Sequence, residues 1–212
     1  RYALGQVLLQ RCVLKNVTKK DRSGLGHMLI FYGFCLFVIS YGFHITEGFH
    51  EKLSPAFFGE GFNNLFFLLL DVAGLAVIFS LIWAAVRRYI IRPSRLEPIM
   101  SKGAAIILVL IFSLMIIGFS VEGFRLLAED KPFADWAFVG ATFSKLFTQM
   151  GLKPYAETLF CLFWYFHMII VFGFGIYLLY SKHLHILTAH PNLYFHSTAP
   201  KGSLQPITDM EE

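Results

Sequence analysis

The chain has 212 residues, of which 56% are hydrophobic and only 15% are charged. A soluble domain carries more charge than this, so the composition predicts a membrane protein. The formal net charge is +4, but the basic residues cluster beside apolar segments and form no single basic face, which argues against a nucleic-acid partner.

Four apolar segments are each close to the roughly 20 residues that a helix needs to cross a bilayer. They cover residues 25–45, 64–85, 103–121 and 158–180. These segments predict an all-α membrane protein, a transmembrane helical bundle with four spans in this chain. The loop of residues 122–157 is expected to hold a short amphipathic helix along the interface, where Trp136 and Trp164 would act as anchors.

The distribution of Lys and Arg predicts the orientation of the bundle. Thirteen of the 18 lie on one side: six before the first span, five near the loop between the second and third spans, and two after the fourth. By the positive-inside rule both ends of this chain face the cytoplasm. We expect residues 1–24 to be a basic cytoplasmic segment, residues 25–182 the membrane bundle, and residues 183–212 a cytoplasmic linker that is extended after His190.

Four histidines fall at two matched depths of the first and fourth spans. His167 and His185 are eighteen residues apart, which predicts one face of a single helix and a separation of about 27 Å. His27 and His44 are seventeen residues apart on the first span, so antiparallel helices would place His27 opposite His185 and His44 opposite His167. Facing imidazoles of this kind predict two b-type haems, with His27 and His185 on the inner iron and His44 and His167 on the outer iron.

Alternatives remain for the ligands of the predicted outer haem. His44 lies about 100° off the stripe of His27, so His50 or the absence of an outer haem are competing possibilities. His183 is about 160° off the face of His167, which makes His185 the better inner ligand. A different class of function, a transporter or channel lined by histidines, is disfavoured because the chain shows no inverted halves or broken-helix signals.

Ionisable residues also occur in the predicted outer half of the bundle. Asp71 lies in the second span, and Glu122 with Arg125 closes the third. Glu122 and Arg125 can pair on one helix face, as a helix-end ion pair or with the arginine on a haem propionate. The alternative is a proton route to a quinone, because acidic residues at such depths are costly and usually functional.

Several motifs occur in order along the chain: SGLGHMLIFYGF, RRYIIRPSRLE, GFSVEGFR, YSKHLHILTAHPNLYF and PKGSLQPI. Together they resemble the membrane domain of prokaryotic membrane-bound iron–sulfur oxidoreductases related to heterodisulfide reductase. The membrane part of that family is similar to the gamma subunit of respiratory nitrate reductase. The resemblance implies b haem, with His167, His185 and His27 matching family ligands. His44 lies further from His27 than the corresponding family ligand does.

The resemblance also implies partners and a location. Members of the family carry a cytoplasmic region with iron–sulfur clusters and CCG modules, and several are thought to pass electrons from electron-transfer flavoprotein to menaquinone. For this chain it implies the prokaryotic cytoplasmic membrane, a fifth helix before Arg1, and an iron–sulfur domain after the linker. A membrane anchor for a heterodisulfide reductase-like or other respiratory complex is the alternative within this class.

Overall fold

The computed structural model describes residues 2–15, 17, 22–50, 53–93, 102–129 and 136–195. Within these ranges every regular element is a helix, and no strand is present. The elements are α1 (Tyr2–Leu8), α2 (Arg11–Leu14), α3 (Ser23–Phe49), the 3-10 helix η1 (Pro55–Phe58), α4 (Glu60–Ala85), the π-helix η2 (Val86–Ile91), α5 (Lys102–Glu129), α6 (Phe138–Gln149), the 3-10 helix η5 (Lys153–Tyr155), α7 (Ala156–Tyr180), the 3-10 helix η6 (Lys182–Leu184) and α8 (His185–Tyr194). Helices α3, α4, α5 and α7 belong to the four segments long and apolar enough to cross a membrane. The predicted all-α class and its four spans are confirmed.

The helices extend beyond the predicted spans at several ends. The largest difference is in α5, which continues past residue 121 to Glu129 and therefore contains Glu122 and Arg125. Glu122 and Arg125 therefore lie inside helix α5 and not at its end. Arg125 pairs with Glu122 and with Glu129 along one helix face, and these ion pairs stabilise two further turns that carry charge.

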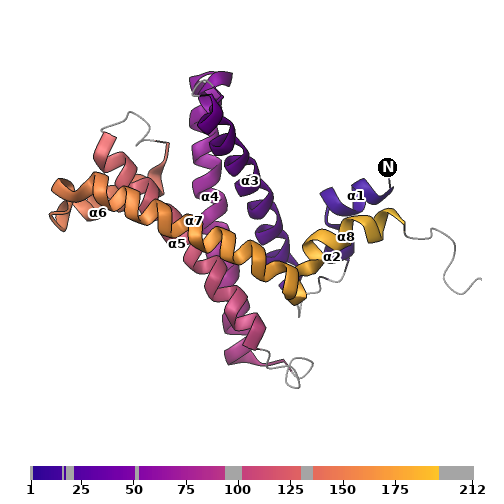
Figure 1. Ribbon diagram of the computed structural model, residues 1–212. Coiled ribbons are helices and arrows are strands. Elements are labelled where there is room, and N and C mark those ends of the chain that lie inside the picture. The colour runs from indigo at the N-terminus through magenta and orange to yellow at the C-terminus, as the bar shows by residue number, and fades with distance from the viewer. Residues whose placement is uncertain are drawn as a thin grey trace, which may run out of the picture.

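Helices α3 and α4 lie side by side, and α5 packs against α4 (Figure 1). Small residues allow the backbones to approach closely. A Cβ atom at Gly33 of α3 would collide with Val77 of α4, and one at Gly74 of α4 would lie 2.5 Å from the Phe119 ring of α5. Glycine at helix crossings is the usual means of close packing in membranes, so these contacts set the spacing of the three helices.

The amphipathic helix predicted within residues 122–157 is present as α6. It packs along the end of α5, where a Cβ atom at Gly123 would collide with Phe143. The rings of Phe124 and Phe147 are stacked there, with centroids 4.0 Å apart and planes 8° apart. Because Phe124 is almost fully buried, this stack anchors α6 to α5.

Helix α7 runs across the other long helices and leads to the end of the molecule where α1, α2 and α8 gather (Figure 1). It ends at Tyr180, because Ser181 has an extended backbone and its Oγ accepts a hydrogen bond from the His183 N–H in the next turn. The prediction that His167 and His185 share one continuous helix is therefore wrong. Helix α8 runs to Tyr194, so the predicted extended linker does not begin at His190, and residues 196–212 lie outside the described part.

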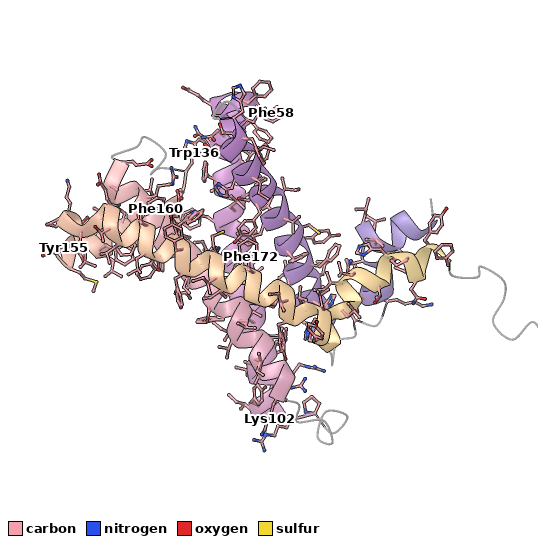
Figure 2. The ribbon with its side chains drawn as sticks, in the orientation of Figure 1. Phe58, Lys102, Trp136, Tyr155, Phe160 and Phe172 are labelled. Carbon is pink, nitrogen blue, oxygen red and sulfur yellow. The ribbon has the colours of Figure 1, made fainter. Side chains whose placement is uncertain are left out.

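Most of the surface of α3 and α7 is exposed and apolar. Among their residues only Gly33, Ser40 and Ala156 are buried. Phe172, midway along α7, is 69% exposed (Figure 2). Lys102 and Phe58 mark opposite tips of the group formed by α3, α4 and α5 (Figure 2). Apolar exposure on this scale is what a lipid-facing surface requires.

Candidate redox site

His27 and His185 face each other although the helix that was predicted to carry His185 is broken. His27 lies in the second turn of α3, and His185 is the first residue of α8. Their ring centroids are 6.3 Å apart, with the planes inclined by 35°. We call this the inner level, following the predicted orientation. The turn at Ser181 redirects the chain after α7 and allows this contact.

The spacing of these rings suits two axial ligands of one iron. Metal–imidazole bonds are about 2.0 Å long, and a ring nitrogen lies a little more than ~1 Å from its centroid, so two ligands on one metal have centroids roughly 6 Å apart. Within the described ranges no three His, Cys, Asp or Glu side chains converge as a metal-binding group. A haem iron needs only two protein ligands, because the porphyrin supplies the other four. The residues at the inner level therefore fit a b-type haem.

A third imidazole lies beside this pair. The ring centroid of His183 is 5.7 Å from that of His185. Burial lowers the pKa of His183, and the nearby His185 and His27 lower it further. In the sequence, His183 was judged the poorer ligand because it lies about 160° from the face of His167 on a continuous helix. The helix is not continuous, so that argument does not apply. His185 nevertheless provides the ring that faces His27.

The outer level is built differently. A hydrogen bond of 2.5 Å joins the Tyr41 hydroxyl of α3 to Nε2 of His167 in α7, with the donor depending on the imidazole tautomer. The two ring planes are nearly parallel, with centroids 6.1 Å apart and planes 16° apart. A Cβ atom at Gly118 of α5 would lie 3.5 Å from Cε1 of His167. The buried Nδ1 of His167 has no hydrogen-bond partner among the described residues.

His44 lies one helical turn beyond Tyr41. Its ring centroid is 6.5 Å from that of Tyr41, and its Nδ1 is 3.9 Å from the Glu47 carboxylate. The side chain of His44 is 67% exposed. Tyr41 makes the direct contact with His167. The outer level therefore does not show two imidazoles facing each other, and an outer haem between them stays a prediction.

Helical geometry explains why Tyr41 takes this place. Fourteen residues separate His27 from Tyr41, which leaves Tyr41 about 40° from the stripe of His27, whereas His44 is about 100° away. The position of Tyr41 near the stripe of His27 could have been read from the sequence. It was missed because only histidines were considered as candidates. Tyr41 is the residue at this level that sequence reasoning missed.

Glu122 and Arg125 form the predicted pair on α5. Arg125 donates two hydrogen bonds to the Glu122 carboxylate, at 2.9 and 2.5 Å, and a further nitrogen lies 3.6 Å from Glu129. The guanidinium carbon also lies 5.5 Å from the centroid of the Phe67 ring of α4. A forked pair of this kind fixes both side chains in one geometry, so Glu122 and Arg125 act as one unit.

Asp71 reaches from α4 to the beginning of α6. Its carboxylate accepts a hydrogen bond of 2.7 Å from the Val139 N–H, in the first turn of α6. Asp71 is only 4% exposed, and its charge interacts with that of Glu122. Because the first amides of a helix have no partners within the helix, this carboxylate caps α6 from a neighbouring span. The sequence did not indicate this partner.

The ionisable residues of this end form one group, which we call the outer charged cluster. The charge of His44 interacts with those of Glu47, Glu122 and Arg125, and the charge of Arg125 also interacts with that of Glu47. The members are His44, Glu47, Asp71, Glu122, Arg125 and Glu129. The cluster extends from the buried Asp71 to the exposed His44, so it joins the bundle interior to the surface.

Two curated proteins are similar to this chain over nearly its whole length. The probable iron-sulfur-binding oxidoreductase FadF of Bacillus subtilis is 24% identical over 205 residues, which cover 93% of this chain and 27% of that protein. The EtfAB:quinone oxidoreductase of Syntrophomonas wolfei is 26% identical over 206 residues, which cover 93% of this chain and 28% of that protein.

The chain thus spans little more than a quarter of the length of these relatives. No family model matches the chain, and no solved structure matches it. Both relatives are oxidoreductases, one named for iron–sulfur binding and the other for electron-transfer flavoprotein and quinone. They support a general role in electron transfer and agree with the resemblance drawn from the sequence motifs.

Proposed function

We propose that this chain is a haem b membrane domain that passes electrons between a cytoplasmic iron–sulfur oxidoreductase region and membrane quinone. The observation that carries the proposal is the pair His27 and His185, whose rings come from different helices and have centroids 6.3 Å apart. The names of the two relatives supply the iron–sulfur, electron-transfer flavoprotein and quinone parts of the proposal. The donor is electron-transfer flavoprotein and the acceptor is menaquinone.

The inner level is the entry point for electrons from the cytoplasmic side. His27 lies near the start of α3, next to the basic N-terminal region, and His185 opens α8, which leads toward the C-terminal linker. A b haem held between them would accept and release one electron at a time at its iron. The imidazoles of His27 on α3 and His185 on α8 would be the residues that hold it. In this arrangement both ends of the chain face the cytoplasm of a prokaryote, and the four long helices cross its cytoplasmic membrane.

The quinone reacts toward the opposite side of the bundle. Reduction of a quinone to a quinol consumes two electrons and two protons, and apolar surroundings cannot supply the protons. The outer charged cluster places ionisable side chains at that end, with Asp71, Glu122 and Arg125 as the candidates for proton handling. Moving an electron through a membrane potential of 100 mV changes its energy by about 2.3 kcal/mol, so this route would couple quinone chemistry to the potential.

Reduced-minus-oxidised visible spectra of the full-length purified protein test the haem assignment. We expect a sharp alpha band that is lost in His27→Ala and in His185→Ala. His190→Ala is the matched control, since His190 lies on the same helix as His185 but more than one turn further along, and this variant should keep the band. A wild-type protein without the band, or inner-level variants that keep it in full, would refute the haem assignment. A protein without haem would return the transporter or channel class to consideration.

A second experiment tests the quinone side. Glu122→Gln should slow quinone turnover while the cytoplasmic donor still reduces the haem at the normal rate. Glu129→Gln is the matched control, because Glu129 is a more distant and more exposed partner of the same arginine. Unchanged turnover in Glu122→Gln would place proton delivery elsewhere. The electron donor is tested separately. Reduction of the haem by electron-transfer flavoprotein would support the proposed complex, whereas reduction by a dithiol donor would support a heterodisulfide reductase-like complex.

A further inference from the structure

A third imidazole stands beside the two predicted haem ligands, and the proposed function does not use it. The ring centroid of His183 is 5.7 Å from that of His185, with the planes inclined by 50°. The Nδ1 atom of His183 is buried and has no hydrogen-bond partner among the described residues. A buried polar atom without a partner costs free energy, so an atom of this kind next to a predicted ligand indicates a role.

We propose that His183 is a positioning residue for the inner haem ligand, with its Nδ1 accepting a hydrogen bond from the ring N–H of His185. This inference rests on the proposed function, since it takes His185 to be an axial ligand of haem iron. It deepens that function by naming the residue that adjusts the reduction potential. A ligating histidine uses one ring nitrogen for the metal and keeps a proton on the other, which a neighbouring acceptor normally holds.

The break after α7 places His183 beside His185. On a continuous α-helix, residues two positions apart point about 160° away from each other, so their rings do not meet. Lys182–Leu184 form a 3-10 helix instead, in which three residues make one turn and positions two apart differ by about 120°. The Ser181 Oγ holds this turn by accepting a hydrogen bond of 3.1 Å from the His183 backbone N–H. The two rings are therefore neighbours because the α-helix stops before them.

The separation of the two rings is within reach of a hydrogen bond. A ring nitrogen lies a little more than ~1 Å from its centroid, so at a centroid separation of 5.7 Å two nitrogens that point at each other are roughly 3.4 Å apart. Hydrogen bonds from N–H groups have donor–acceptor distances of about 3 Å. A small rotation of the His183 or His185 side chain supplies the difference.

The proposed bond has a direct effect on the redox properties of the site. An acceptor on the N–H of a ligating imidazole makes that imidazole a stronger electron donor, which favours the ferric over the ferrous state. One hydrogen bond changes an equilibrium by about twofold to tenfold. A tenfold change in the ratio of ferrous to ferric haem corresponds to about 59 mV for a one-electron couple. Loss of the acceptor should therefore raise the midpoint potential by up to about 59 mV.

Redox titration of the full-length purified protein, followed at the alpha band, tests this inference. His183→Phe keeps a ring but has no acceptor, so its midpoint potential should rise while its haem content stays that of the wild type. His183→Asn is the conservative variant, because its side-chain oxygen can replace Nδ1 as the acceptor, and its potential should stay close to that of the wild type. His190→Phe, on the same helix as His185 but more than one turn further along, is the matched control and should leave the potential unchanged.

The electron paramagnetic resonance signal of the ferric haem gives a second readout. It reports the strength of the axial ligands, so it should shift in His183→Phe and stay unchanged in His183→Asn. His183→Ala carries the same expectation as His183→Phe, and it is used if the larger ring does not fit beside His185.

Three results would overturn the inference without touching the proposed function. The first is a wild-type potential in both His183→Phe and His183→Ala. The second is an equal shift in His183→Phe and His183→Asn, which would assign the effect to packing and not to the acceptor. The third is loss of haem from both His183→Phe and His183→Ala, which would make His183 a ligand or a packing residue. Absence of haem from the wild type would instead refute the proposed function itself, so the two failures are distinguishable.

Discussion

Two substitutions at Asp71 separate a structural role from a role in proton transfer. Asp71→Asn keeps an oxygen that can accept the hydrogen bond from the Val139 N–H, but the amide cannot take up and release a proton. Asp71→Ala removes the acceptor and leaves the buried amide at the start of α6 without it. The structural argument predicts that the alanine variant is clearly destabilised and the asparagine variant only slightly.

The expected sizes follow from the geometry. The bond is 2.7 Å long, and the side chain is 4% exposed, so water cannot replace it easily. Loss of a helix cap costs about 0.5–2 kcal/mol, and a hydrogen bond to a charged group is worth about 1.5–3 kcal/mol. We expect Asp71→Ala to lower the free energy of unfolding by about 2 kcal/mol. Asp71→Asn removes the interaction of the carboxylate charge with the α6 helix dipole, which lowers the free energy of unfolding by about 0.3–1 kcal/mol. It also removes the repulsion between Asp71 and Glu122, which offsets part of this loss.

Unfolding of the full-length protein in mixed micelles by increasing amounts of a denaturing detergent, followed by circular dichroism, measures these differences. Ser80→Ala is a suitable control, because Ser80 is buried in the same helix but bonds only the Ala76 carbonyl one turn earlier. If Asp71→Ala is as stable as the wild type, or if asparagine is as damaging as alanine, the capping argument is wrong. Slowed quinone turnover in Asp71→Asn at unchanged stability would support the predicted proton role.

Three further changes test other parts of the structure. His183→Ala should retain the alpha band and the haem content in the visible spectrum, whereas His185→Ala should lose both; the opposite pattern would make His183 the ligand. Arg125→Met should lower the free energy of unfolding by about 1–3 kcal/mol, measured by detergent-induced unfolding, because the Glu122 carboxylate loses its forked partner. Gly33→Leu should separate α3 from α4 and reduce haem content, since its side chain would collide with the facing helix; a fully loaded variant would contradict the close packing seen at this crossing.

The four spans and the pair on α5 follow from local sequence. A run of about 20 apolar residues must bury its backbone polar groups within itself in a bilayer, which makes it a helix whatever its neighbours are. Glu122 and Arg125 are three residues apart, so helix formation alone brings them together. The contact between His27 and His185 was also expected, although the reasoning assumed that one continuous helix carries both His167 and His185.

The tertiary structure, in contrast, determined which residues of different helices are in contact. Asp71 bonds an amide 68 residues away, and no periodicity within α4 marks a carboxylate that caps another helix. Ser181 ends α7 through its extended backbone and a hydrogen bond in the next turn, although the apolar pattern and the histidine spacing favoured a continuous helix. Tyr41 meets His167 because the crossing of α3 and α7 selects which face of each helix is in contact. Sequence periodicity defines the faces of a helix, but only its packing against a partner determines which face is used and which residue stands opposite.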